Sequence, residues 1–175
     1  MIEVLKESLW KQFGASIDML KNAIELWPED YWNSQLRFFY LSYHTLVFLD
    51  YYLTKPPEDF NSSLPFTIIG PAEMAPDAVD DIKPDRIYTK EELLDYLQSC
   101  RRKCRHIIEN LTEQNVHERW IEKQSRRNYS TLEILLYNMR HVQHHAAQLN
   151  LMLRERTNLA PNWVSRAVDD DHNYF

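Results

Sequence analysis

Four stretches of the chain repeat apolar residues at spacings of three and four, the pattern of an amphipathic α-helix. We predict helices over about 3–25, 34–54, 89–111 and 130–156. Pro28 ends the first helix, because proline has no amide hydrogen and its ring blocks the preceding turn. Gly14 lies inside that helix, where it either weakens the helix or lets a neighbouring segment approach closely.

Two of these helices begin with a capping box, in which side chains of the first turn satisfy free amide groups. Thr89 is followed three residues later by Glu92, and Ser130 is followed by Glu133. In each pair the hydroxyl can accept a hydrogen bond from the glutamate amide while the glutamate side chain reaches back. Ser130 is therefore better explained as a helix cap than as a nucleophile.

The helix predicted over 34–54 is apolar or aromatic on nearly every side. A helix of that kind is buried on most of its surface. His44 lies at its midpoint and is the only histidine among the first 100 residues. A neutral buried imidazole needs a partner for each nitrogen, and a metal ion is one such partner.

The connection over 55–88 holds six of the eight prolines. So long an irregular segment in a compact domain is usually functional or a crossover. Helices of about 20 residues are about 30 Å long, so this segment can return the chain along a bundle and leave the helices on either side of it parallel. We expect a short helical or extended piece around 116–121. The tail over 157–175, with its acidic run at 169–171, is expected to pack loosely or to be partly disordered.

Composition narrows the class of protein. With 175 residues, 44% of them apolar, the chain can bury a core, and we expect a single domain over 1–175. The net charge of −6 argues against nucleic acid or an anionic membrane as the main partner. The N-terminus lacks an apolar signal region, and the longest apolar run, 38–53, is too short and too polar to span a membrane. We expect a soluble cytoplasmic protein.

Other reactive residues have simpler explanations. Cys100 and Cys104 fall on the core stripe of the third helix and are expected to be small buried residues rather than a redox or metal site. His106, His117 and His172 have no motif around them and are expected on the surface. The basic runs at 101–103 and 126–127 are expected to be solvated, although the place of Arg126 and Arg127 just before the last helix would also let them face an anionic ligand.

The strongest chemical signal is a pair of histidines in the last predicted helix. His141 and His145 are four residues apart, so they lie about 40° apart around the helix axis and can bind one metal ion. His144 is turned about 60° from His141 and about 100° from His145, which favours a surface position. The glutamate of the H-E-x-x-H motif is absent, because Val142 and Gln143 occupy that part of the segment, so a zinc protease is disfavoured.

We expect His44 to complete this site from the second predicted helix. Three neutral imidazoles with an open coordination position suit zinc, or nickel with added water. Asn138 and Gln148 lie on the same side of the last helix as the pair and are expected to contact the ligands. The alternative is a bundle without metal, in which the histidines are hydrogen-bonded within the core.

The segment over 130–156 resembles the last helix of the DinB/YfiT-like metal-binding superfamily. That helix carries a T-x-x-E-L-L start and then H-x-x-H-H-R-G-Q-L, and the residues that match the second motif here are His141, His144, His145, Gln148 and Leu149. The Arg-Gly pair of the superfamily is replaced by Ala146-Ala147. The segment from His44 to Asp50 resembles the H-x-x-x-x-x-x-D segment of the superfamily's second helix, with the aspartate one place early.

This resemblance implies an all-α fold, a four-helix bundle of up-down-down-up topology with a long crossover between its second and third helices. It implies a divalent metal, zinc or nickel, on His44, His141 and His145, and a homodimer. Characterised relatives include transferases and isomerases that use bacillithiol, mycothiol or glutathione. The first hypothesis is therefore a metal-dependent thiol S-transferase or hydrolase acting on a small molecule, with a low-molecular-weight thiol as cosubstrate. The second is a metal-binding structural or stress-response protein without turnover.

Overall fold

The computed structural model describes residues 1–123 and 127–168 of the chain. Arg126, the acidic run at 169–171 and His172 lie outside the described residues. The described part is mainly α-helical, which confirms the predicted fold class. Its helices are α1 (Ile2–Leu26), the single turn α2 (Glu29–Trp32), α3 (Leu36–Tyr52), α4 (Lys90–Glu109) and α5 (Thr131–Thr157). None of these helices is long and apolar enough to cross a membrane.

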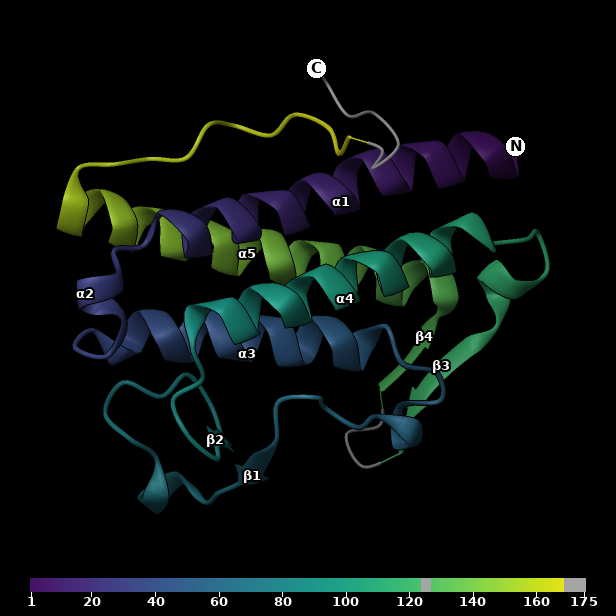
Figure 1. Cartoon of the computed structure of the whole chain (residues 1–175). Helices are drawn as coiled ribbons and strands as arrows, with labels where there is room; N and C mark the ends of the chain where they lie inside the picture. The colour runs from purple at the N-terminus through teal and green to yellow at the C-terminus, as the bar shows by residue number, and fades with distance from the viewer. Residues whose placement is uncertain (124–126, 169–175) are drawn as a thin grey trace.

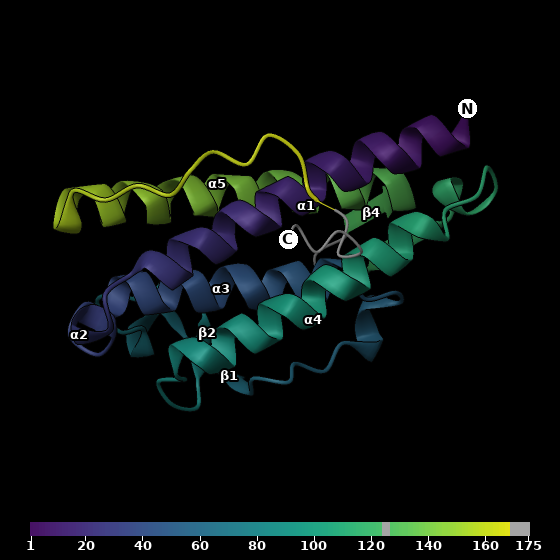
Figure 2. The ribbon, with the colours of Figure 1, turned by 45° about the horizontal axis from the view of Figure 1, so that its top comes forward.

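The four long helices lie side by side along a common direction (Figure 1). Helix α1 packs against α4 and α5, and α3 packs against the same two helices. Figures 1 and 2 show that α3 and α4 run in one direction while α1 and α5 run in the other. The parallel course of α3 and α4 follows from the segment between them, which returns the chain to the end of the molecule where α3 began.

Helix α3 is buried on most of its surface, because its side chains are apolar on almost every side. Ten of its residues are buried, whereas Tyr40, His44, Phe48 and Tyr51, which share one side of the helix, are partly exposed. Trp27, at the end of α1, stacks on Phe38 at the start of α3 with ring centroids 3.9 Å apart. Both predicted capping boxes are formed, at Thr89 for α4 and at Ser130 for α5. These caps set where the two following helices begin.

The crossover from α3 to α4 contains structure that the sequence pattern did not indicate. Strands β1 (Phe66–Ile68) and β2 (Ile82–Pro84) pair antiparallel, with Thr67 opposite Lys83. Two single turns of 3-10 helix, η1 (Pro57–Asp59) and η2 (Pro71–Glu73), lie in the same segment. The crossover is therefore an ordered layer along α3.

A second short hairpin joins α4 to α5. It follows a 3-10 turn, η3 (Asn115–His117), and consists of β3 (Arg119–Glu122) and β4 (Arg127–Ser130). The prediction of a short helical or extended piece around 116–121 is confirmed. Trp120 on β3 is buried and donates from its indole nitrogen to the carbonyl of Thr54, at 2.8 Å. This bond fixes the hairpin to the end of α3.

The described part of the tail, 158–168, has no buried residue and is mostly exposed, so it packs loosely, as predicted, apart from contacts near its end. It runs back along the helices (Figure 2). The amide of Ala167 donates to the carbonyl of Lys11 at 2.9 Å. Arg101 was expected to be solvated, but it is buried, pairs with Asp18 and donates to the carbonyl of Val168 at 3.1 Å. Gly14 permits this approach, because a Cβ there would lie 2.5 Å from the Cβ of Ala167.

Replacing Gly14 by alanine should therefore lower the free energy of unfolding. The steric conflict costs about 1–3 kcal/mol, offset by about 1 kcal/mol of better helix propensity. Urea unfolding should show a smaller loss from Gly14→Ala when Ala167→Gly is also present, because the second change removes the opposing Cβ. Equal losses in the two backgrounds would show that the tail does not press on Gly14.

Candidate metal centre

The structure brings together the three histidines predicted as metal ligands. His44 comes from the middle of α3, and His141 and His145 come from successive turns of α5. One ligand nitrogen from each residue lies within 4.8 Å of the other two. The Nε2 atoms of His44 and His141 are 3.1 Å apart. The packing of α3 on α5 thus joins residues separated by almost a hundred positions.

This geometry fits a divalent metal ion. Imidazole nitrogens bind zinc at about 2.0–2.1 Å, so two ligands of a tetrahedral site lie about 3.3 Å apart. The distance between the Nε2 atoms of His44 and His141 is close to that value. The three histidines could therefore hold a divalent metal with little movement of the helices.

An aspartate from the crossover completes the surroundings of His44. Its Nδ1 atom lies 2.5 Å from Oδ2 of Asp80, and because a carboxylate accepts, the imidazole donates there. The other carboxylate oxygen of Asp80 accepts from the amide of Ile82 at 3.2 Å, which ties it to the start of β2. With its proton held on Nδ1, His44 presents the lone pair of Nε2 toward His141. A carboxylate behind a metal-binding imidazole orients the ring and raises its basicity.

Gln148 has the same effect on His145. The Nδ1 atom of His145 lies 2.7 Å from Oε1 of Gln148, one turn further along α5. An amide oxygen accepts, so this imidazole also carries its proton on Nδ1 and leaves Nε2 free. Two of the three histidines are thus held in the tautomer that a metal bound at Nε2 requires.

Asn138 hydrogen-bonds to α3, and His144 is exposed. Asn138 is fully buried, but its amide nitrogen donates to the carbonyl of Leu49 on α3 at 2.9 Å. This hydrogen bond thus joins α5 to α3 and involves none of the three histidines. His144 is exposed, with its ring 5.0 Å from that of His145, as its angular position indicated.

Burial keeps the free imidazoles neutral. It lowers the pKa of His141 to about 3, and the neighbouring His145 and His44 add to the effect. Burial likewise lowers the pKa of His145 to about 4. The Nδ1 atom of His141 is buried and has no hydrogen-bond partner among the described residues. A neutral imidazole is the form that binds a metal.

Aromatic rings enclose one side of the histidine cluster. Phe48 lies one turn after His44 on α3, and their ring centroids are 4.7 Å apart. Tyr52 lies one turn further, with its ring 5.8 Å from that of His141. Sequence reasoning missed these two neighbours, although their positions four and eight residues after His44 could have found them. Asp80 carries no comparable signal, because it lies in an irregular segment with several other acidic residues.

Several residues that carry reactive groups have structural roles instead. Asp50, which the resemblance placed near the ligand on α3, accepts from Lys103 at 2.6 Å and from Tyr96 at 2.8 Å. It therefore joins α3 to α4 rather than contacting the histidines. Cys100 and Cys104 are buried, as predicted, and burial raises the pKa of both thiols. Neither thiol is suited to act as a nucleophile.

Comparison with known proteins gives one family match. The model of the DinB family matches residues 73–160, half of the chain. This stretch contains Asp80, His141 and His145, and His44 lies before it. No curated protein and no solved structure matches the chain.

The lowered histidine pKa values make the stability of the metal-free protein dependent on pH. Unfolded histidines bind protons below about pH 6.5, whereas His141 and His145 do so in the folded state only near 3 and 4. Their contribution to the free energy of unfolding is complete above about pH 6.5 and is lost as the pH falls below that value. Unfolding then takes up as many as about two protons, which sets the slope of the free energy of unfolding against pH.

Urea unfolding in a chelator at pH 7, 6 and 5 should show this loss. The double variant His141→Gln/His145→Gln should show a shallower pH dependence, because the two buried groups that resist protonation are gone. His106→Gln, at an exposed position, serves as the control and should retain the original slope. A slope shared by all three proteins would refute the assignment.

Asp80→Asn should weaken metal binding about 10–100-fold, the usual effect of removing a carboxylate behind a ligand histidine. The asparagine keeps the shape but no longer has the charge that favours a proton on Nδ1 of His44. Asp81→Asn is the matched control, because Asp81 is the next residue and its side chain is exposed. Competition for Zn²⁺ with a chelating dye would measure both, and equal affinities would exclude a role for Asp80.

Proposed function

The chain belongs to the DinB family, and from this premise we propose that it is a metal-dependent enzyme acting on small molecules. We place one divalent ion, zinc or nickel, on His44, His141 and His145. We propose thiol S-transfer or hydrolysis as the reaction, with a low-molecular-weight thiol or water as the nucleophile. We also assign the four long helices to an up-down-down-up bundle, supported by the directions of α1, α3, α4 and α5.

One observation supports the proposal of catalysis: His141 borders an open hollow on the surface of α5. This hollow of about 580 Å³ is lined by His141 together with Tyr137, Arg140, Gln143, His144 and Ala147, whereas His44 and His145 do not line it. Its size is that of a small-molecule site. Catalytic zinc sites use three protein ligands and leave one position for water or substrate, whereas structural sites are closed by four. Three histidine ligands, one of which borders an open hollow, fit the first pattern.

The residues around the histidine cluster have different roles in this proposal. Asp80 and Gln148 hold the protons of His44 and His145 on Nδ1, so the opposite nitrogens remain available as ligands. Phe48 and Tyr52 exclude water from one side. A divalent cation, when bound, supplies the positive charge that lowers the pKa of a thiol or water molecule and so yields a nucleophile near neutral pH.

A structural role for the metal is the second candidate. The three histidines come from two helices, so an ion held by them would fasten α3 to α5. Binding free energy at such a site adds directly to the stability of the fold. The two candidates differ in whether a small molecule reaches the ion.

Metal content tests the site itself. We expect about one equivalent of Zn²⁺ or Ni²⁺ by elemental analysis, lost in His44→Ala, His141→Ala and His145→Ala. The control is His144→Ala, which removes an exposed histidine from the same turn of α5 and should leave metal content unchanged. Full metal content in the three variants, or loss in His144→Ala alone, would contradict the assignment.

Turnover separates the two roles. The metal-loaded protein should conjugate electrophiles from a broad panel with at least one low-molecular-weight thiol, or hydrolyse an ester or amide. The His141→Ala variant should lose that activity, and His144→Ala should keep it. No turnover over the whole panel, together with a large fall in melting temperature on chelation, would favour the structural role.

A further inference from the structure

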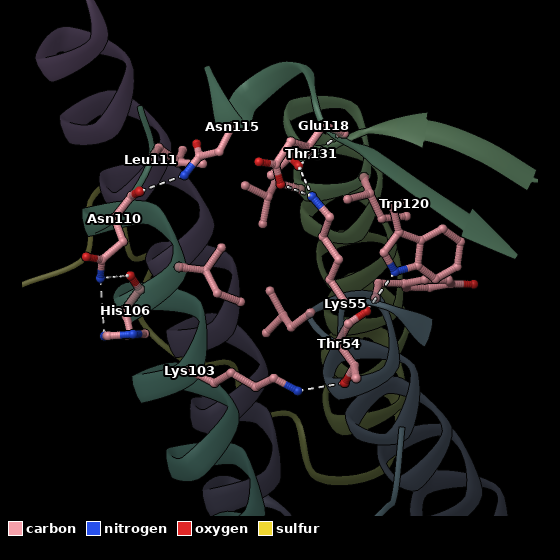
Figure 3. Close-up of a pocket in the computed structure, with 15 residues that line it drawn as sticks. Thr54, Lys55, Lys103, His106, Asn110, Leu111, Asn115, Glu118, Trp120 and Thr131 are labelled. Atoms are coloured by element: carbon pink, nitrogen blue, oxygen red, sulfur yellow. Dashed lines mark hydrogen bonds and ion pairs between the residues drawn. The ribbon is translucent and has the colours of Figure 1, made fainter. Parts of the chain in front are cut away.

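Figure 3 shows a second cavity, whose volume is about 500 Å³. It opens between the ends of α3 and α4, with η3, β3 and the first turns of α5 closing its other sides. Tyr52 lines this cavity, and its ring also lies 5.8 Å from the ring of His141. None of the three histidines lines this cavity.

The floor of the cavity is apolar. Leu53, Leu111, Ile134 and Leu135 line it and are almost completely buried, and Ile107 lies half-buried beside them. A recess of this volume with aliphatic walls is large enough for the apolar part of a small molecule.

The rim carries two lysines with different surroundings. Lys103 crosses from α4 toward α3, where it donates to Asp50 at 2.6 Å. It also donates to the hydroxyl of Thr54 at 2.7 Å (Figure 3). Asp50 is mostly buried and also accepts from Tyr96. Lys103 is therefore part of the contact between α3 and α4, and Asp50 already neutralises its charge.

Lys55 is held more weakly. Its ammonium group donates to Glu118 at 2.7 Å and to the hydroxyl of Thr131 at 3.2 Å (Figure 3). The side chains of Lys55 and Glu118 are 35% and 54% exposed, and an ion pair so open to solvent contributes about 0–1 kcal/mol. A carboxylate from a ligand can therefore replace Glu118 at this lysine with little loss, while Thr131 offers a second hydrogen bond.

We propose that this cavity binds an amphipathic monocarboxylic acid. Its aliphatic part covers the apolar floor, and its carboxylate pairs with Lys55 and accepts from the hydroxyl of Thr131. The two lysines on the rim disfavour a cationic head group. With only one readily released ammonium group, and with Glu118 beside it, the rim is poorly suited to a phosphate or another multiply charged anion.

Titration calorimetry with octanoate, 1-octanol and octylammonium tests the chemistry of the head group. The full chain is used in the presence of a chelator, so that no carboxylate binds through a metal. Octanoate should bind tightest and octylammonium weakest. Octanoate should bind His144→Ala equally well, because this exposed histidine lies outside the cavity. No heat from octanoate at millimolar concentration, or tighter binding of octylammonium, would overturn the proposal.

Variants locate the binding. Lys55→Met keeps the aliphatic stem and should weaken octanoate tenfold or more, because a hydrogen bond to a charged group is lost. It should change the affinity for 1-octanol less than twofold. The matched control is Lys123→Met, which removes an exposed lysine from the turn after β3 and should leave octanoate binding unchanged. Equal effects of the two lysine variants would contradict the proposal.

Filling the cavity should abolish binding of both octanoate and 1-octanol. Ile107→Trp places an indole over the floor, and Asn110→Trp does so from an exposed position on the rim, where it is less able to disturb folding. Circular dichroism melting identifies which variants are folded. Undiminished binding of octanoate to a folded variant of either kind would place the ligand elsewhere.

Discussion

The contact between α3 and α5 is the one on which the rest of the structure depends. It brings His44 against His141 and His145, and it is reinforced by the buried bond from Asn138 to the carbonyl of Leu49. Apolar side chains on almost every face of α3 require neighbours on almost every side of it. The histidine cluster is therefore a consequence of how a buried helix is covered, because His44, at mid-length, faces the two imidazoles of α5.

Most of this could be predicted from residue spacing. Periodic apolar positions located the four long helices, Thr89 and Ser130 marked where two of them start, and the interval of four placed His141 and His145 on one face. These signals are local, because a helix repeats within a few residues. The choice of His44 rested on its place at the middle of the most apolar helix, together with the resemblance.

What escaped prediction depends on contacts between distant segments. Asp80 lies in an irregular loop, where no periodicity says which of several carboxylates turns inward. The antiparallel pairing of β1 with β2, three residues each, positions it, and strands so short leave little pattern in the sequence. Asn138 illustrates the same limit: residue spacing gives its face of α5, but only the course of α3 shows that the Leu49 carbonyl lies within its reach.

The hydrogen bond between His44 and Asp80 couples the crossover to any ion that the three histidines bind. Any ion that favours the proton on Nδ1 of His44 also favours the loop conformation that delivers Asp80, and by reciprocity the ordered loop favours the ion. The segment that connects α3 to α4 thus has a second property besides its length. The ordering of this segment and the binding of an ion to the three histidines share one coupling free energy, so each favours the other.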